Sequence, residues 1–105
     1  MPDRERRQGP RIPTQLWVEQ TGPGGTYFNY TANLSTGGMY LDHTVPHPIG
    51  TIVQLEFKLP DDEAPIRVRA KIVSAPTDTL GMGLHFLDVP APIAARIQAF
   101  IAKNG

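Results

Sequence analysis

Along most of the chain, apolar residues alternate with polar ones, which is the period that places every second side chain on one face of a β-strand. Within residues 51–60 the apolar set is Val53, Leu55, Phe57 and Leu59. Within residues 65–73 it is Ile66, Val68, Ala70 and Ile72. The polar link "PDDEAP" joins the two segments, so they are predicted to form an antiparallel hairpin with one buried face.

Four more segments have strand character. Residues 14–20 and 26–34 flank "TGPGG", a glycine-rich turn, and two shorter apolar segments cover residues 38–42 and 80–88. No helical period separates these segments, which number about six in all. The pattern therefore predicts an all-β barrel or sandwich rather than a parallel sheet.

The C-terminal segment has a different period. Over residues 91–103, one helical face carries Ile93, Ile97, Phe100 and Ile101. Pro92 suits a first helical turn, Lys103 suits a last turn, and Gly105 suits a stop. We expect one amphipathic helix that packs on the barrel or covers one of its ends, within a single domain over residues 1–105.

Composition narrows the classes of function. The chain of 105 residues carries 10 basic and 10 acidic residues, and this balance opposes bulk electrostatic binding of DNA, RNA or acidic membranes. There is no cysteine, so neither disulfides nor thiolate metal sites are expected. The chain has no apolar run long enough for a membrane span and no signal-like apolar segment near residue 1, so we expect a cytoplasmic protein.

An arginine cluster precedes the first strand-like segment. "RRQGPR" contains Arg6, Arg7 and Arg11, with Gly9 and Pro10 between the last two. The Gly-Pro pair disfavours a helix, so the segment is predicted to be a loop or extended arm. Such a cluster is typical of a solvated terminus, and also of a site where guanidinium groups bind phosphate or guanine edges.

A second polar motif lies at the end of residues 26–34. "NLSTGG" supplies Asn33, Ser35, Gly37 and Gly38. Side chains two positions apart share one side of an extended chain, and glycines let a ligand approach the backbone closely. An ordinary turn with an Asn or Ser cap has the same composition.

Taken in order, the two stretches resemble the signature of the PilZ domain family, which is RxxxR followed by [DN]xSxxG. Arg7 and Arg11 match its first part, and Asn33, Ser35 and Gly38 match its second. "GMGLHFLD", residues 81–88, is also similar to the penultimate strand of the family, which its helix follows. The resemblance covers nearly the whole chain, with Asn33 where Asp is commoner.

The resemblance implies a six-stranded antiparallel barrel that binds the bacterial second messenger cyclic di-GMP. It divides the chain into a flexible arginine-rich arm (1–11), a barrel (14–88) and a C-terminal helix (91–103). By this resemblance, the arginines of the motif bind guanine edges and phosphates, and the Asn and Ser side chains hydrogen-bond the ligand from the barrel surface. By the same resemblance, Gly38 leaves space for a base. The implied ligand-binding residues are Arg6, Arg7, Arg11, Asn33, Ser35, Gly37 and Gly38, with Arg6 as a third cation that supports an intercalated pair of ligands.

Catalysis and metal binding have little support in the sequence. No Ser-His-Asp set, paired carboxylate site or phosphate-binding loop is present, so no enzymatic activity and no cofactor are expected. His43 and His47 lie near Asp42, but Pro46 interrupts their spacing and no third ligand follows, so no metal site is expected.

We therefore expect a cyclic di-GMP receptor or adaptor, a monomer or weak dimer, whose arm orders on ligand binding and which signals to a downstream protein. One alternative is a PilZ-like interaction module of a motility or secretion system that does not bind the ligand. Another is a barrel for single-stranded nucleic acid, which needs exposed aromatic residues and a basic groove. Neutral charge and only eight aromatic residues, several at apparent core positions, oppose it. Trp17 could pack under the helix, stack on a base or form a dimer contact.

Overall fold

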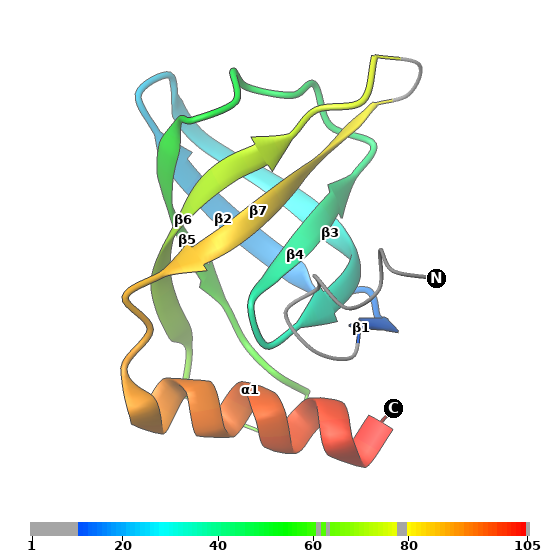
Figure 1. The fold of residues 1–105 in the computed structure, drawn as a ribbon, viewed down its shortest axis with the longest axis vertical. Helices are drawn as coiled ribbons and strands as arrows, with labels where there is room; N and C mark the ends of the chain where they lie inside the picture. Colours follow the sequence, from blue (N-terminus) through cyan, green and yellow to red (C-terminus); the bar gives the residue numbers. More distant parts are fainter. Residues whose placement is uncertain (1–10, 61, 63, 78–79, 105) are drawn as a thin grey trace, which may run out of the picture.

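The computed structural model describes residues 11–104 apart from residues 61, 63, 78 and 79. The described chain forms a strongly curved antiparallel sheet with one helix lying across an open end of it (Figure 1). The elements are β1 (Arg11–Pro13), β2 (Trp17–Gly22), β3 (Gly25–Ser35), β4 (Gly38–Asp42), β5 (Ile52–Phe57), β6 (Ile66–Ser74), β7 (Gly81–Leu87) and α1 (Ala91–Asn104).

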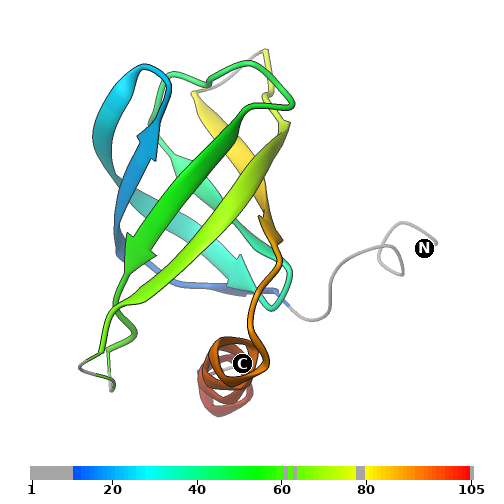
Figure 2. The same cartoon turned by 90° about the vertical axis from the view of Figure 1, so that its left-hand side faces the viewer.

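The sheet closes on itself. The strand order is β1-β3-β2-β5-β6-β7-β4, and an additional pairing of β3 with β4 completes a ring of six strands. The short strand β1 lies outside that ring and pairs with the C-terminal part of β3. The predicted six-stranded antiparallel barrel with a single C-terminal helix is confirmed, and the structure adds one short strand (Figure 2).

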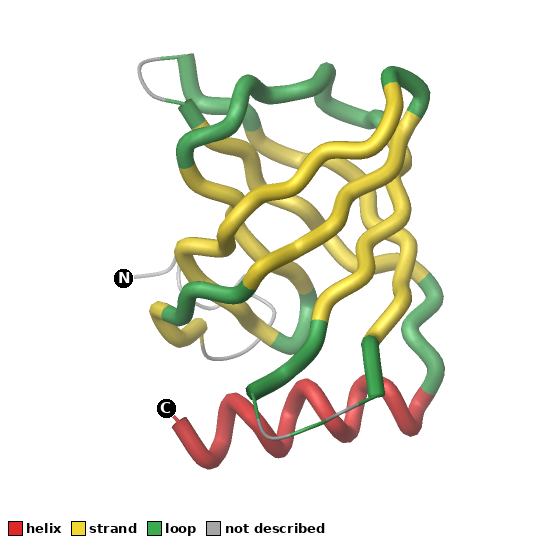
Figure 3. Tube along the Cα trace, turned by 180° about the vertical axis from the view of Figure 1, so that it is seen from behind, coloured by secondary structure: helices red, strands yellow, loops and turns green. Residues whose placement is uncertain are grey.

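The core follows the predicted alternation. Every inward position of the two long apolar segments is buried, at Val53, Leu55, Phe57, Leu59, Ile66, Val68, Ala70 and Ile72. The helix adds Ile97, Phe100 and Ile101 to the same core, and Ile93 packs at its margin. Burial of this apolar stripe therefore places α1 across one barrel end, against β1 and β3 (Figure 3).

Two boundaries differ from the sequence-based expectation. The segment predicted as one strand over residues 14–20 is interrupted, because the buried Thr31 hydroxyl donates to the Thr14 carbonyl at 2.6 Å and accepts from the Leu16 N–H at 2.9 Å. These side-chain hydrogen bonds interrupt the regular pairing with β3 between β1 and β2, although the backbone bonds Thr14 N–H to Ala32 O and Thr31 N–H to Leu16 O remain. Arg11 was assigned to the arm, yet its backbone belongs to β1, and residues 1–10 lie outside the described part of the chain.

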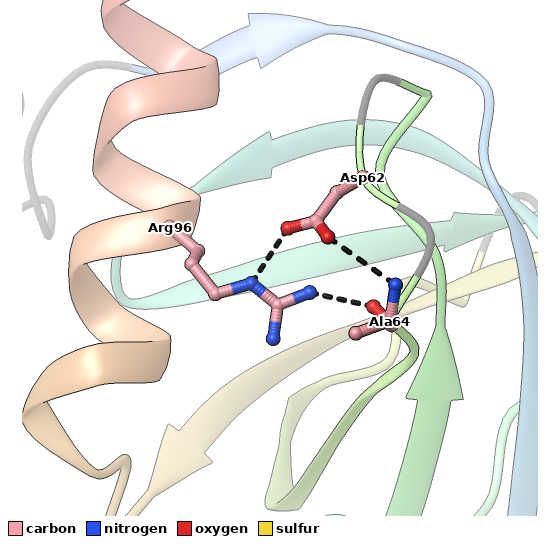
Figure 4. Close-up of polar contacts among 3 residues, drawn as sticks. All are labelled: Asp62, Ala64 and Arg96. Carbon is pink, nitrogen blue, oxygen red and sulfur yellow. Dashed lines mark hydrogen bonds and ion pairs between the residues drawn. The ribbon is translucent and has the colours of Figure 1, made fainter.

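A polar link fastens α1 to the loop between β5 and β6 (Figure 4). Arg96 Nε donates to Asp62 Oδ2 at 2.6 Å, and Arg96 Nη2 donates to the Ala64 carbonyl. Asp62 Oδ1 accepts from the Ala64 N–H at 3.2 Å. The hydrogen bond from Arg96, helped by the Ala64 N–H, holds the pKa of Asp62 below its ordinary value. Within the described residues, α1 is too short and too polar for a membrane span.

Candidate ligand-binding site on the barrel wall

The two sequence motifs meet through strand pairing. In the β1–β3 register, Arg11 lies opposite Ser35 and Pro13 lies opposite Asn33. The end of the arginine segment therefore runs antiparallel to "NLS", although more than twenty residues separate the two stretches in the sequence. Arg6 and Arg7 lie outside the described residues, so their contribution to the site stays a prediction.

Ser35 holds the turn between β3 and β4. Its fully buried Oγ accepts from the Gly37 N–H at 3.2 Å and from the Gly38 N–H at 3.1 Å. A single hydroxyl thus serves two backbone donors of the turn, of which the Gly38 N–H is buried and the Gly37 N–H partly buried. The structure thus contains the Ser-capped turn that was one of the two interpretations of this motif. Direct contact of Ser35 with a ligand stays a prediction.

The glycines of the motif bring β4 close to β7. A Cβ atom on the buried Gly38 would lie 2.0 Å from the Leu84 carbonyl oxygen, so no larger residue fits without a backbone shift. The neighbouring Gly37 carbonyl accepts from the Phe86 N–H at 2.8 Å. Close packing of β4 against β7 therefore requires glycine at position 38. This structural reason is separate from the predicted role of Gly38 in leaving space for a base.

Asn33 lies at a shallow pocket on the outer wall of the barrel. Register pairs place Asn33 opposite Tyr40, and Tyr40 opposite Gly83, so the three positions form a row across β3, β4 and β7. The pocket measures about 270 Å³ and is lined by Asn33, Met39, Tyr40, Val73, Ser74, Gly83 and Leu84. Reasoning from the motif found Asn33 but missed Tyr40 and Ser74, which come from other strands.

The glycines of β7 make room for side chains of the neighbouring strands. A Cβ atom on Gly81 would lie 2.4 Å from Tyr40 Oη, and one on Gly83 would lie 2.5 Å from Ser74 Oγ and in ordinary contact with Tyr40 Cδ1, at 3.7 Å. The ring of Tyr40 therefore covers the glycine backbone of β7 beside Asn33. The glycines inside "GMG" were the signal for this contact, because glycine within a strand often marks close approach of another group.

Apart from the half-buried Tyr40, the aromatic residues divide into two groups. Phe57, Phe86 and Phe100 are buried in the core, whereas Trp17, Tyr27, Phe28 and Tyr30 are exposed on β2 and β3. Trp17 does not pack under the helix but stacks on Phe28, with ring centroids 5.7 Å apart. Several aromatic residues therefore occupy core positions, as the sequence indicated, while the β2–β3 hairpin carries an exposed aromatic group.

The remaining candidates have local partners. His43 Nδ1 lies 3.3 Å from Asp42 Oδ2, whereas the ring of His47 contacts Tyr27, so the two imidazoles face different groups. In the part of the chain that the structure describes, no three metal-binding side chains cluster. Arg67 pairs with Glu56 across the strands at 3.0 Å, and Arg69 pairs with Asp88.

Solved structures share this fold. The inhibitor of motility MotI/DgrA of Bacillus subtilis superposes with a TM-score of 0.77 at 19% identity, over 94% of this chain and 51% of its own. Escherichia coli YcgR in complex with c-di-GMP gives 0.77 at 20% identity, over 93% and 45%. The PilZ domain of CeSA from a cellulose-synthesizing bacterium gives 0.70 at 18% identity, over 92% and 100%. The chain thus spans about half the length of MotI/DgrA and of YcgR.

A match to a family model is more specific than these distant structural likenesses. No curated protein sequence matches the chain. The PilZ domain model, however, matches residues 5–103, which include both halves of the motif, the whole barrel and nearly all of α1. From its sequence motifs, its closed barrel and this match, the protein belongs to the PilZ domain family.

Proposed function

We propose that this chain is a non-enzymatic receptor for cyclic di-GMP, which it binds on the barrel wall between the arginine motif and the Asn33 pocket. The observation that carries the proposal is the β1–β3 register, which brings Arg11 beside Ser35 and so joins both halves of the PilZ motif. The structure of YcgR in complex with c-di-GMP, which has the same fold, supports this choice of ligand.

The dimensions of the site fit one base. A pocket of about 270 Å³ is slightly smaller than a usual small-molecule site, so we expect it to take one guanine and to leave the rest of a dinucleotide on the surface. Tyr40 offers an aromatic ring to that base, and the Asn33 amide supplies both a donor and an acceptor. The guanidinium groups of Arg7 and Arg11 bind phosphates or the N7 and O6 edge of guanine.

Ligand binding and ordering of residues 1–10 are coupled in this proposal. Met1 is the only large apolar side chain in "MPDRERRQGP", so burial offers little to offset the entropy of ordering the arm. A ligand with two phosphates and two guanines supplies charge-assisted partners instead. The ordered arm then changes the surface that a downstream partner in the cytoplasm recognises.

A second candidate is an interaction module that binds no ligand. The exposed Trp17, Phe28 and Tyr30 favour it, because aromatic side chains are enriched at protein interfaces. The two candidates differ in whether the Asn33 pocket has a ligand at all.

Calorimetric titration with cyclic di-GMP tests the proposal. We expect saturable binding that Asn33→Ala weakens by about tenfold, since loss of one hydrogen bond to a charged or polar ligand costs about 1.4 kcal/mol. A pair of stacked ligands supported by Arg6 gives a ratio of two per chain, which Arg6→Leu lowers towards one. Absence of binding by the folded wild type would leave the interaction module as the function. Equal binding of an oligothymidylate would indicate a nucleic-acid barrel.

A further inference from the structure

A second constellation lies on the outer wall, and it is separate from the PilZ motif. The β2–β3 register places Trp17 opposite Tyr30, and the β3–β4 register places Tyr30 opposite Asp42. Residues directly opposite on neighbouring strands share one face of the sheet. Two aromatic rings and a carboxylate therefore form a row across three strands.

The rings of this row are arranged as a corner. The planes of Trp17 and Tyr30 meet at 63° with centroids 4.8 Å apart, and Phe28 stacks nearly parallel to Trp17, at 10°. These three side chains are large and apolar, yet they are 53%, 48% and 54% exposed for Trp17, Tyr30 and Phe28 respectively. Contiguous exposed aromatic surface of this kind marks an interaction site more often than scattered single residues do.

A pocket of about 200 Å³ lies in this corner. Its lining is Gln15, Trp17, Phe28, Asn29, Tyr30, Thr31, Asp42 and His43. Asp42 is the acidic residue of this lining, and none of the lining residues is lysine or arginine. Lys58 directly follows Phe57, the last residue of β5, and is outside the lining. The backbone N–H of His43 donates to Asp42 Oδ1 at 3.0 Å, and Nδ1 of the exposed His43 ring lies 3.3 Å from Asp42 Oδ2, so both contacts orient the carboxylate.

We propose that this pocket, defined by Trp17, Tyr30 and Asp42, binds an arginine side chain of a partner protein. The negative faces of the rings and the carboxylate both attract a cation. A planar guanidinium stacks on an indole while its N–H groups donate to a carboxylate, which an ammonium group does less well. The volume suits one side chain and is below that of a typical nucleotide pocket.

The Asp42 carboxylate also disfavours binding of nucleic acid or of a cyclic dinucleotide in this pocket. A carboxylate without a neighbouring lysine or arginine in the lining repels the phosphates of a nucleic acid or of a cyclic dinucleotide. This pocket therefore differs in chemistry from the Asn33 pocket, whose lining carries no acidic residue. The proposal is independent of cyclic di-GMP binding.

Amide NMR spectra of the full chain test the proposal, with N-acetylarginine methylamide as the probe and N-acetylcitrulline methylamide as its neutral analogue. We expect the arginine probe to shift the signals of Trp17, Tyr30 and Asp42, and the citrulline probe to leave them nearly unchanged. Two variants should fold like the wild type, because Asp42→Asn keeps an oxygen that accepts from the His43 N–H and Trp17→Ala changes an exposed side chain. Each should weaken binding of the arginine probe by about 5- to 10-fold. Asp88→Asn, which neutralises a carboxylate outside the pocket, is the matched control.

Several results would overturn the proposal. Equal shifts with the citrulline probe, or an unchanged response to the arginine probe in Asp42→Asn, would show that the pocket does not select a positively charged side chain. Shifts of the same signals by an oligothymidylate would assign the surface to single-stranded nucleic acid. Signals of Trp17 that move with protein concentration alone would assign it to a second copy of the chain.

Discussion

Arg11 lies directly opposite Ser35 in the antiparallel pairing of β1 with β3. One residue belongs to the arginine motif that precedes the barrel, and the other holds the β3–β4 turn with its buried hydroxyl. Strand pairing, rather than any contact that is local in the sequence, therefore sets the position of the Arg11 backbone relative to the strand that carries Asn33.

Removing an arginine of the motif should weaken cyclic di-GMP binding while the barrel stays folded. A charge-assisted hydrogen bond contributes about 1.5–3 kcal/mol, so Arg11→Ala or Arg7→Ala is expected to raise the dissociation constant by about 10- to 100-fold. Calorimetry measures this change. Arg67→Ala, which removes a guanidinium that pairs with Glu56, should leave the affinity unchanged. Unchanged affinity in both motif variants would remove the arginines from the site.

Tyr40 should contribute to affinity through its ring. Stacking of a base on an aromatic side chain is worth about 1–3 kcal/mol, so Tyr40→Ala is expected to weaken cyclic di-GMP by about 5- to 100-fold. Tyr40→Phe keeps the ring over Gly81 and Gly83 and should retain most of the affinity. If Tyr40→Ala binds cyclic di-GMP as tightly as Tyr40→Phe and the wild type do, the ring does not contact the ligand.

Ser35 should matter for stability whether or not ligand is present. Ser35→Ala leaves the buried Gly38 N–H and the partly buried Gly37 N–H without their acceptor, which costs about 1–3 kcal/mol. For a domain of this size each kcal/mol corresponds to about 4–8 °C in melting temperature. Ser74→Ala makes the same chemical change at an exposed position and should melt close to the wild type. A thermal melt of the free protein makes the comparison, and an unshifted Ser35→Ala would contradict the role assigned to the hydroxyl.

Gly38→Ala should open the barrel between β4 and β7. The added methyl group would lie 2.0 Å from the Leu84 carbonyl oxygen, and relief requires a shift of the backbone. Overpacking of this kind costs about 1–3 kcal/mol or more, so we expect a lower melting temperature and faster amide exchange in β4 and β7. Gly24→Ala, in the exposed β2–β3 turn, meets only the flexible end of Tyr27 and should have little effect.

The link between Arg96 and Asp62 should make stability depend on acid. Because the folded pKa of Asp62 is lowered, its stabilisation is fully present above the ordinary aspartate pKa of about 3.9 and is lost as pH falls through the folded pKa. The difference in melting temperature between wild type and Arg96→Gln should therefore be constant near neutral pH and shrink below about pH 4. The remaining difference reflects the hydrogen bond of Arg96 to the Ala64 carbonyl.

A control for this pH dependence is Arg67→Gln, because the pair of Arg67 with Glu56 is more exposed. Its side chains are 63% and 39% exposed, against 27% and 31% for Arg96 and Asp62. Exposed pairs contribute little, so this variant should follow the acid profile of the wild type closely. A difference between wild type and Arg96→Gln that grows as pH falls would contradict the lowered pKa of Asp62.

Local patterns predicted the elements and the ordered motif. Alternation at Val53, Leu55 and Phe57 requires only that one strand face be buried, and the apolar stripe of α1 requires only a helical period. The residues that make up each pattern lie within a few positions of one another, so each pattern can be recognised in the sequence without knowledge of the tertiary structure. The PilZ motif is likewise a linear order of residues, and it predicted the family correctly.

Closure of the barrel determines which residues from distant parts of the sequence come into contact, and no local pattern contains this information. The register brings Arg11 to Ser35, places Trp17 and Asp42 on either side of Tyr30, and lays Tyr40 over two glycines of β7. The steric reason for Gly38 and the link from Asp62 to Arg96, 34 residues apart, arise in the same way. Each depends on which residue of one strand or helix faces which residue of another. That choice is made by burial of the whole core at once, because a shift of one residue would turn each apolar face outward.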